Sequence, residues 1–132
     1  MKLKMLMAAP LLAAGCAGEP VVADRAGYDE AVRCAAFLEA VGIFYAALAE
    51  QSQDGPAAER ASARSAAGAA FRVRAINLGA PLAKGRSDTE RDIAAVASEI
   101  QREQGRRPFT DYAIWLGREA DRCPRPPVEP PR

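Results

Sequence analysis

Apolar residues recur along the chain with the spacing of α-helices. From Gly27 to Gln51 they alternate in steps of three and four, as a helix with one buried face does; the stripe consists of Cys34, Phe37, Val41, Phe44 and Leu48. Between residues 34 and 49 the only charged residue is Glu39. We therefore expect this helix to be central and covered on most sides. The uncharged run is too short, and too clearly interrupted, to favour a membrane span.

Three further helices are predicted, over about residues 56–78, 87–104 and 110–123, because apolar periodicity resumes after each break. Asp54 is expected to cap the second helix, and Pro56 suits its first turn. Gly79 is expected to end that helix in the left-handed conformation, since Pro81 prevents the helix from continuing.

The ends of the third and fourth helices are also marked. Ser87–Glu90 has the S-x-x-E spacing of a capping box, in which side chains at both ends satisfy unpaired amides. Gly105 is expected to stop the third helix. Thr110 is expected to cap the fourth, with Phe109 contacting Ile114 in a hydrophobic staple.

Short connections make successive helices antiparallel neighbours. The predicted fold is therefore all-α, a small up-down four-helix bundle over residues 27–123. Residues 16–26 are interpreted as a tether. Residues 124–132 contain five prolines in nine positions, which is typical of an extended, disordered tail in solvent. The alternative for this tail is a docking peptide.

The N-terminus has the order of a signal peptide. Lys2 and Lys4 precede an uncharged run over residues 5–14, and small residues stand directly before Cys16. Ten apolar residues suit an export signal, whereas a membrane-spanning helix needs roughly 18 or more. Residues 1–15 are therefore predicted to be removed. An uncleaved helix is disfavoured because Pro10 would interrupt it.

The segment Leu11-Leu12-Ala13-Ala14-Gly15-Cys16 resembles the lipobox of bacterial lipoproteins. This resemblance covers the N-terminus only, and it departs from the family pattern at Ala13, where the family usually has leucine. It implies lipidation of Cys16, removal of residues 1–15, and a membrane-anchored protein of the periplasm or outer membrane. The alternative is ordinary cleavage after Ala17, which would leave a soluble periplasmic protein.

Two cysteines remain if Cys16 is lipidated or lost. In an oxidising compartment, Cys34 and Cys123 are then expected to form a disulfide. An up-down bundle brings the start of the first helix and the end of the fourth to the same end, which supports this pairing. The alternative is a pair of buried free thiols.

Charge and composition exclude several classes of function. Without Lys2 and Lys4, 16 basic residues face 17 acidic ones, a net charge of −1, so no global field attracts nucleic acid. The chain has no histidine, which removes His-based nucleophile systems and the Glu-x-x-His motif of di-iron bundles. It contains no C-x-x-C pair and no glycine-rich phosphate loop. We expect no metal, no cofactor and no enzymatic activity.

One basic feature suggests a contact surface. Arg60 and Arg64 are four residues apart and share a helix face, so they are candidate contacts for a partner, although a solvated face is the alternative. The resulting hypothesis is an exported, non-enzymatic protein that binds an unknown envelope protein. The alternative is a carrier that holds a small or lipid-like ligand inside the bundle, in a cavity lined by alanine and glycine.

Overall fold

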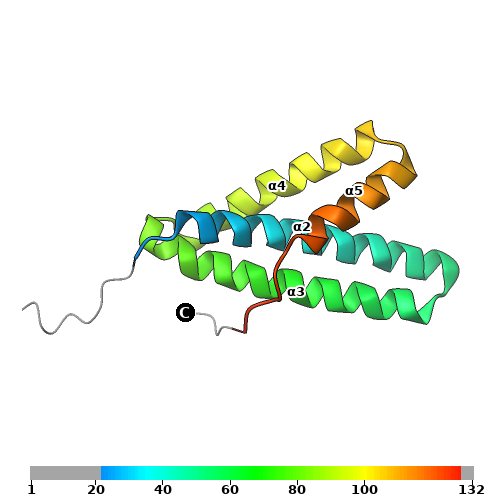
Figure 1. The fold of residues 1–132 in the computed structure, drawn as a ribbon, viewed down its shortest axis with the longest axis horizontal. Helices are drawn as coiled ribbons and strands as arrows, with labels where there is room; N and C mark the ends of the chain where they lie inside the picture. The colour runs from blue at the N-terminus through cyan, green and yellow to red at the C-terminus, as the bar shows by residue number, and fades with distance from the viewer. Residues whose placement is uncertain (1–21, 129–132) are drawn as a thin grey trace, which may run out of the picture.

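The computed structural model describes residues 22–128, which fold into α-helices without a strand (Figure 1). Four helices follow one another: α2 (Arg25–Ser52), α3 (Gly55–Gly79), α4 (Arg86–Arg106) and α5 (Phe109–Asp121). A short 3₁₀ helix, η1 (Ala80–Leu82), joins α3 to α4. The predicted all-α bundle is confirmed. The predicted signal peptide, Cys16 and residues 129–132 of the tail lie outside the described residues.

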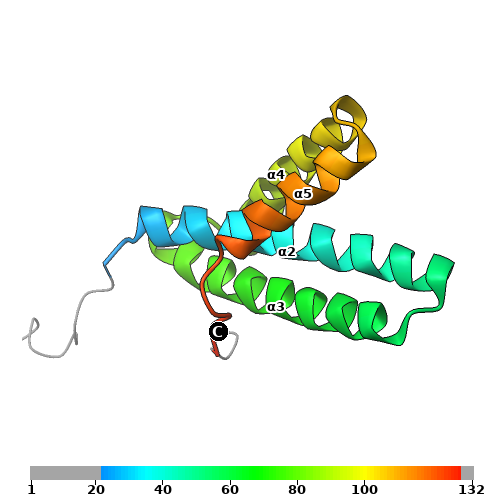
Figure 2. The ribbon, with the colours of Figure 1, turned by 45° about the vertical axis from the view of Figure 1, so that its right-hand side comes forward.

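The helices form two hairpins of unequal length. α2 and α3 lie side by side and antiparallel, whereas α4 and α5 form a shorter hairpin that crosses α2 at an angle (Figures 1 and 2). α2 contacts each of the other three helices. The buried residues of α2 lie between Tyr28 and Gly42, and beyond them the shorter hairpin contacts Phe44 through the rings of Phe109 and Tyr112. The expectation that this helix is covered on most sides is wrong for its C-terminal half, where Ile43 is 71% exposed.

A disulfide joins the N-terminal part of α2 to the chain just after α5. Cys34 and Cys123 are bonded, with their Cα atoms 5.7 Å apart, as the cysteine count predicted. Arg33 lies beside this bond. Its guanidinium donates to the backbone oxygen and the carboxylate of Glu119, at 2.7 and 2.6 Å, and stacks on the ring of Phe37 at 4.8 Å. The C-terminal end of α5 is thus held on α2 by a covalent bond and a charged hydrogen bond together.

Small residues bring α2 and α3 close together. A Cβ atom on Gly68 would lie 3.0 Å from the backbone nitrogen of Glu39 and 3.3 Å from the carbonyl oxygen of Ala35. A Cβ atom on Gly42 would lie 3.2 Å from the backbone nitrogen of Ser65. The glycines and alanines of this interface therefore serve tight helix packing. The carrier hypothesis needs them to line an internal cavity instead.

The end of α3 differs from the prediction. Gly79 keeps right-handed helical dihedral angles (φ −70°), and the chain continues into η1 before Ala83 adopts the left-handed conformation (φ 59°). A Cβ atom on Gly79 would lie 2.8 Å from Oγ1 of Thr89 and 3.2 Å from the ring of Tyr28. Glycine stands at this position because there is no room for a side chain.

The expected capping box of α4 is also wrong. The helix begins at Arg86, and the backbone amide of Gly85 donates to the carboxylate of Asp88 at 2.9 Å. Ser87 therefore lies inside the helix. Thr89 is fully buried in the contact with α2, so the start of α4 is determined by packing as well as by capping.

Proline, rather than glycine, ends α4. The helix runs through Gly105 to Arg106, and Arg107 is extended because it precedes Pro108. α5 then begins directly at Phe109, so Thr110 is inside the helix and is not its cap. The ring of Phe109 stacks on Phe44 of α2, with ring centroids 5.6 Å apart. This contact takes the place of the expected staple.

Candidate functional site

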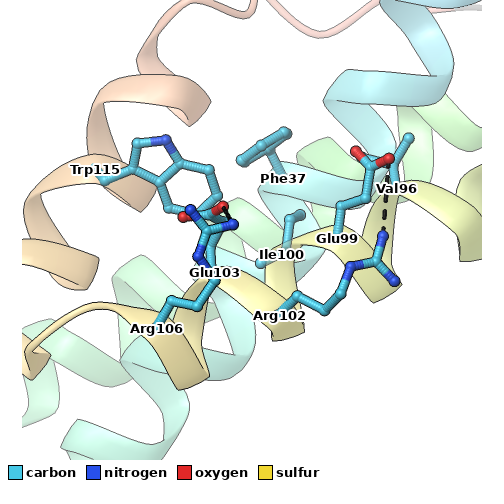
Figure 3. A pocket seen from close by; sticks show the side chains of 8 residues that line it. All are labelled: Phe37, Val96, Glu99, Ile100, Arg102, Glu103, Arg106 and Trp115. Atoms are coloured by element: carbon cyan, nitrogen blue, oxygen red, sulfur yellow. Dashed lines mark ion pairs between the residues drawn. The ribbon is translucent and has the colours of Figure 1, made fainter.

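Two clefts flank Trp115 where α4 and α5 meet α2. The first, of about 340 Å³, is seen in Figure 3. It has an apolar floor, formed by Phe37, Val96, Ile100 and Trp115, and a charged rim, formed by Glu99, Arg102, Glu103 and Arg106. The second, of about 350 Å³, lies on the outer side of α5; it is lined by Arg107, Asp111, Ile114, Trp115, Arg118, Glu119 and Arg122. We call the two clefts together the Trp115 surface.

The amphipathic pattern of α5 positions this surface. Tyr112, Leu116 and Ala120 recur every fourth residue and are buried against α2. Trp115 precedes one of them and is half-buried, with its ring edge-on to Phe37 at a centroid distance of 5.5 Å. Ile114 projects from the outer side and is 53% exposed. An aromatic and an aliphatic side chain are thereby presented on one helix.

Arg107 stands between the two clefts. Its guanidinium stacks over the ring of Trp115 at 4.8 Å, and its Nε donates to the carboxylate of Glu103 at 2.7 Å. Arg106 also pairs with Glu103, at 3.0 Å. The hydrogen bond from Arg107 holds the pKa of Glu103 below its usual range. Glu103 is therefore a charged anchor for the arginines and is poorly suited to accept a proton.

The outer cleft contains an arginine without an ion-pair partner. Within residues 22–128, Arg118 forms no hydrogen bond or ion pair. Glu119, the nearest carboxylate along the chain, is 2.6 Å from Arg33 and 3.4 Å from Arg122. Arg118 is thus an exposed hydrogen-bond donor beside the apolar side chain of Ile114.

The Trp115 surface is slightly positive overall. Its lining holds five arginines and four carboxylates, namely Arg102, Arg106, Arg107, Arg118 and Arg122 against Glu99, Glu103, Asp111 and Glu119. Trp and Arg are enriched among the residues that contribute most to protein–protein affinity, because both combine a large flat contact area with directed polar groups.

A second polar cluster fastens the start of α2 to α4. The hydroxyl of Tyr28 donates to Asp92 at 2.5 Å, and Lys84 donates to the same carboxylate oxygen at 2.7 Å. Burial, followed by the hydrogen bond to Asp92, raises the pKa of Tyr28 to about 12. The hydrogen bonds from Lys84 and then Tyr28 hold the pKa of Asp92 below its usual range. Because Tyr28 is only 1% exposed and its hydroxyl is engaged by Asp92, we interpret this cluster as structural.

Arg72 links three helices in a similar way. From α3 its guanidinium donates to Glu39 of α2, at 2.7 and 3.0 Å, and to Glu90 of α4. Each of these side chains is about one-third exposed. The network therefore lies at the edge of the core, where its charges are partly solvated, and we interpret it as structural.

The predicted contact residues Arg60 and Arg64 interact with different helices. The Arg60 guanidinium lies 5.3 Å from the ring centre of Tyr45 on α2. Arg64 pairs with Asp121 of α5 at 3.3 Å. Cys34 and Cys123 meet as described above, and Cys16 lies outside the described residues.

Two features of residues 22–128 bear on metal binding and on membrane insertion. No group of three or more histidine, cysteine or carboxylate side chains is placed to hold a metal ion there. α2 is long and apolar enough to cross a membrane, but half of its most apolar 18-residue window is buried inside the protein. The central helix of a bundle has this same composition, so α2 is only weak evidence for a membrane span.

Comparison with protein families, with curated proteins and with solved structures found no match to this chain. Its function must therefore be inferred from its own residues. The Trp115 surface was missed from the sequence because Phe37 and Trp115 are far apart along the chain. One feature of the sequence could have indicated this surface. Ile114 lies almost opposite Leu116 on a helical wheel, and an isoleucine that points away from the core indicates a second apolar face.

Proposed function

We propose that this chain is an exported, non-enzymatic envelope protein that binds another protein through the Trp115 surface. The observation that carries the proposal is the combination on α5 of exposed Ile114, half-buried Trp115 and unpaired Arg118. Residues of these types, grouped around a preformed cleft, are the usual centre of a protein–protein interface.

Export is supported by two independent features. The N-terminal order of basic, apolar and small residues before Cys16 is that of a secretory signal. The disulfide between Cys34 and Cys123 is of a kind that persists in oxidising compartments and is rare in the cytosol. We propose the periplasm or the outer membrane as the location, with a lipid anchor at Cys16. A soluble periplasmic form is the alternative.

The ion pairs formed by the carboxylates of the two clefts agree with a binding role. Glu99, Glu103 and Glu119 are each engaged by arginine, at distances between 2.6 and 3.9 Å. A general acid or base needs a pKa near the working pH, and the hydrogen bond from Arg107 lowers the pKa of Glu103 away from that range. These groups are better suited to orient the arginines toward a partner.

Site-specific photo-cross-linking in living cells tests this function. A photo-reactive residue replaces Ile114 in the full chain, and the matched control carries it at Ala94, which is exposed on α4. We expect the first position to cross-link one discrete envelope protein and the control to cross-link none. The same products from both positions, or none from either, would contradict the proposal.

A further inference from the structure

A second surface, distinct from the Trp115 surface, is exposed on the C-terminal half of α2. It consists of Ile43, Phe44, Ala47 and Leu48, with Phe109 and Tyr112 of α5, around a cleft of about 210 Å³. Ile43 is 71% exposed and Phe109 is 67% exposed. We call it the Ile43 surface. It shares no residue with the lining of the Trp115 surface.

The floor of this cleft is a preformed aromatic cluster. The rings of Phe44 and Phe109 stack with centroids 5.6 Å apart and an interplanar angle of 29°. Tyr112 meets Phe44 edge-on at 6.3 Å. Phe109 is thus held in place by neighbouring rings although solvent reaches most of it. A surface ordered in this way loses little conformational entropy when a partner covers it.

Toward its C-terminal end, α2 is packed mainly against α3 (Figures 1 and 2). The rings of Phe109 and Tyr112 still contact Phe44 of α2. Toward the C-terminal end of α2 the α4–α5 hairpin diverges, and α2 and α3 continue side by side (Figures 1 and 2). Residues 40–49 of α2 carry no charged side chain. Helices with such a face are normally buried in bundles of four. Two copies of the pair would supply the four helices.

The lack of charge in the Ile43 surface favours a second copy of the chain as its partner. Its lining contains no charged residue, and the polar groups at its rim are the amides of Gln51 and Gln104. An amide both donates and accepts hydrogen bonds, so it can pair with its own symmetry mate. The described residues hold 15 basic and 15 acidic side chains, so two copies do not repel each other through net charge.

A lipid surface suits these charges less well. The end of the α2–α3 hairpin next to the Ile43 surface carries Glu50, Asp54 and Glu59 against Arg60. Helices that lie on anionic bilayers place lysine and arginine beside their apolar face. We infer that the Ile43 surface binds the same surface of a second copy of this chain, which produces a two-fold symmetric dimer and leaves the Trp115 surface open. A symmetric dimer needs a self-complementary patch, and an uncharged apolar patch with an amide rim meets that requirement.

Sedimentation equilibrium of the full exported chain tests this inference. The chain carries Cys16→Ser, so that an acyl group does not drive association. We expect a concentration-dependent shift toward twice the chain mass. Ile43→Glu should weaken the dimer at least tenfold, because two carboxylates would face each other across the two-fold axis. Ile114→Glu makes the same change at an exposed isoleucine of the Trp115 surface, and it should leave the dimer unchanged.

Each alternative to this dimer predicts a different experimental result. A chain that remains monomeric up to about 200 μM would overturn the inference, as would a dimer that Ile43→Glu leaves intact. Binding of the monomeric chain to vesicles of phosphatidylglycerol would assign the surface to lipid instead. Circular dichroism confirms that each variant is folded, and Phe109→Glu provides a second variant on the other wall of the cleft. Neither the oligomeric state nor vesicle binding affects cross-linking from position 114, which tests the Trp115 surface.

Discussion

At the scale of single residues, a few long-range contacts determine how the two hairpins meet. Cys34 and Cys123 are 89 positions apart in sequence, and Arg33 reinforces their bond by holding Glu119. Tyr28, nearer the start of the same helix, fastens α2 to α4 through Asp92. Because these contacts join α2 to both helices of the shorter hairpin, we expect changes at either anchor to alter the stability of the whole domain.

The disulfide is expected to contribute a large share of that stability. By loop-closure entropy, a cross-link that closes about 90 residues contributes about 4 to 5 kcal/mol, and losing a native disulfide typically costs about 2–5 kcal/mol. The Cys34→Ser, Cys123→Ser double variant should therefore unfold at a clearly lower urea concentration than the oxidised protein. Oxidised protein treated with reductant should behave like the variant. Unfolding midpoints that coincide with and without the bond would rule out this role.

Tyr28 is expected to make stability fall at high pH. Its pKa is about 12 in the folded protein, against an ordinary value of 10.0 for a tyrosine, so the unfolded state loses the proton first. The contribution is complete below pH 10 and declines between pH 10 and 12, by about 1.4 kcal/mol per unit. Tyr28→Phe removes this group and should flatten the decline. Urea unfolding at several pH values measures it, and equal slopes in both proteins would disprove the assignment.

At the scale of helices, the close contact of α2 and α3 depends on glycine. Gly68→Ala places a methyl group 3.0 Å from the backbone nitrogen of Glu39, so the helices must separate slightly. We expect the free energy of unfolding to fall by about 1–2 kcal/mol, although alanine favours helix. Gly105→Ala is the matched control, because a Cβ atom there meets no other residue. It should raise stability by about 0.5–1 kcal/mol, and a gain at both positions would contradict tight packing.

The order of the helices and the pairing of Cys34 with Cys123 could be predicted from the sequence. The helix ends and the exposed apolar surfaces could be predicted only in part. Periodicity and breaks are local signals, and so is the capping role of Asp54, which accepts from the amide of Ala57 at 3.4 Å. The ends at Gly79 and Ser87 were mispredicted because Gly79 and the buried Thr89 are constrained by contact with Tyr28 or its neighbours. The exposure of Ile43 could not be read from an uncharged run, because a buried helix has the same composition.

At the scale of the whole molecule, the termini and the two surfaces define how the protein would act in the envelope. The Ile43 surface lies toward the far end of α2 from Arg25, where the chain enters the domain (Figure 1). A lipid anchor at Cys16 would therefore attach the domain to the membrane through its opposite end.

Processing of the N-terminus is checked on the native protein. Intact-mass and peptide analysis should show a chain that begins at Cys16 and carries acyl groups, as the lipobox-like segment implies. A chain that begins at Gly18 would retain export and remove the anchor. A mature chain that still contains Met1 would contradict export altogether.

The most direct test of the account compares two charge reversals in a binding assay with the partner cross-linked from position 114. Arg118→Glu changes an arginine of the Trp115 surface, and Arg86→Glu makes the same change at an exposed position at the start of α4. We predict that Arg118→Glu raises the dissociation constant at least tenfold, about 1.4 kcal/mol, and that Arg86→Glu leaves it unchanged. Equal affinities for both variants and the wild-type protein would contradict a protein-binding role for the Trp115 surface.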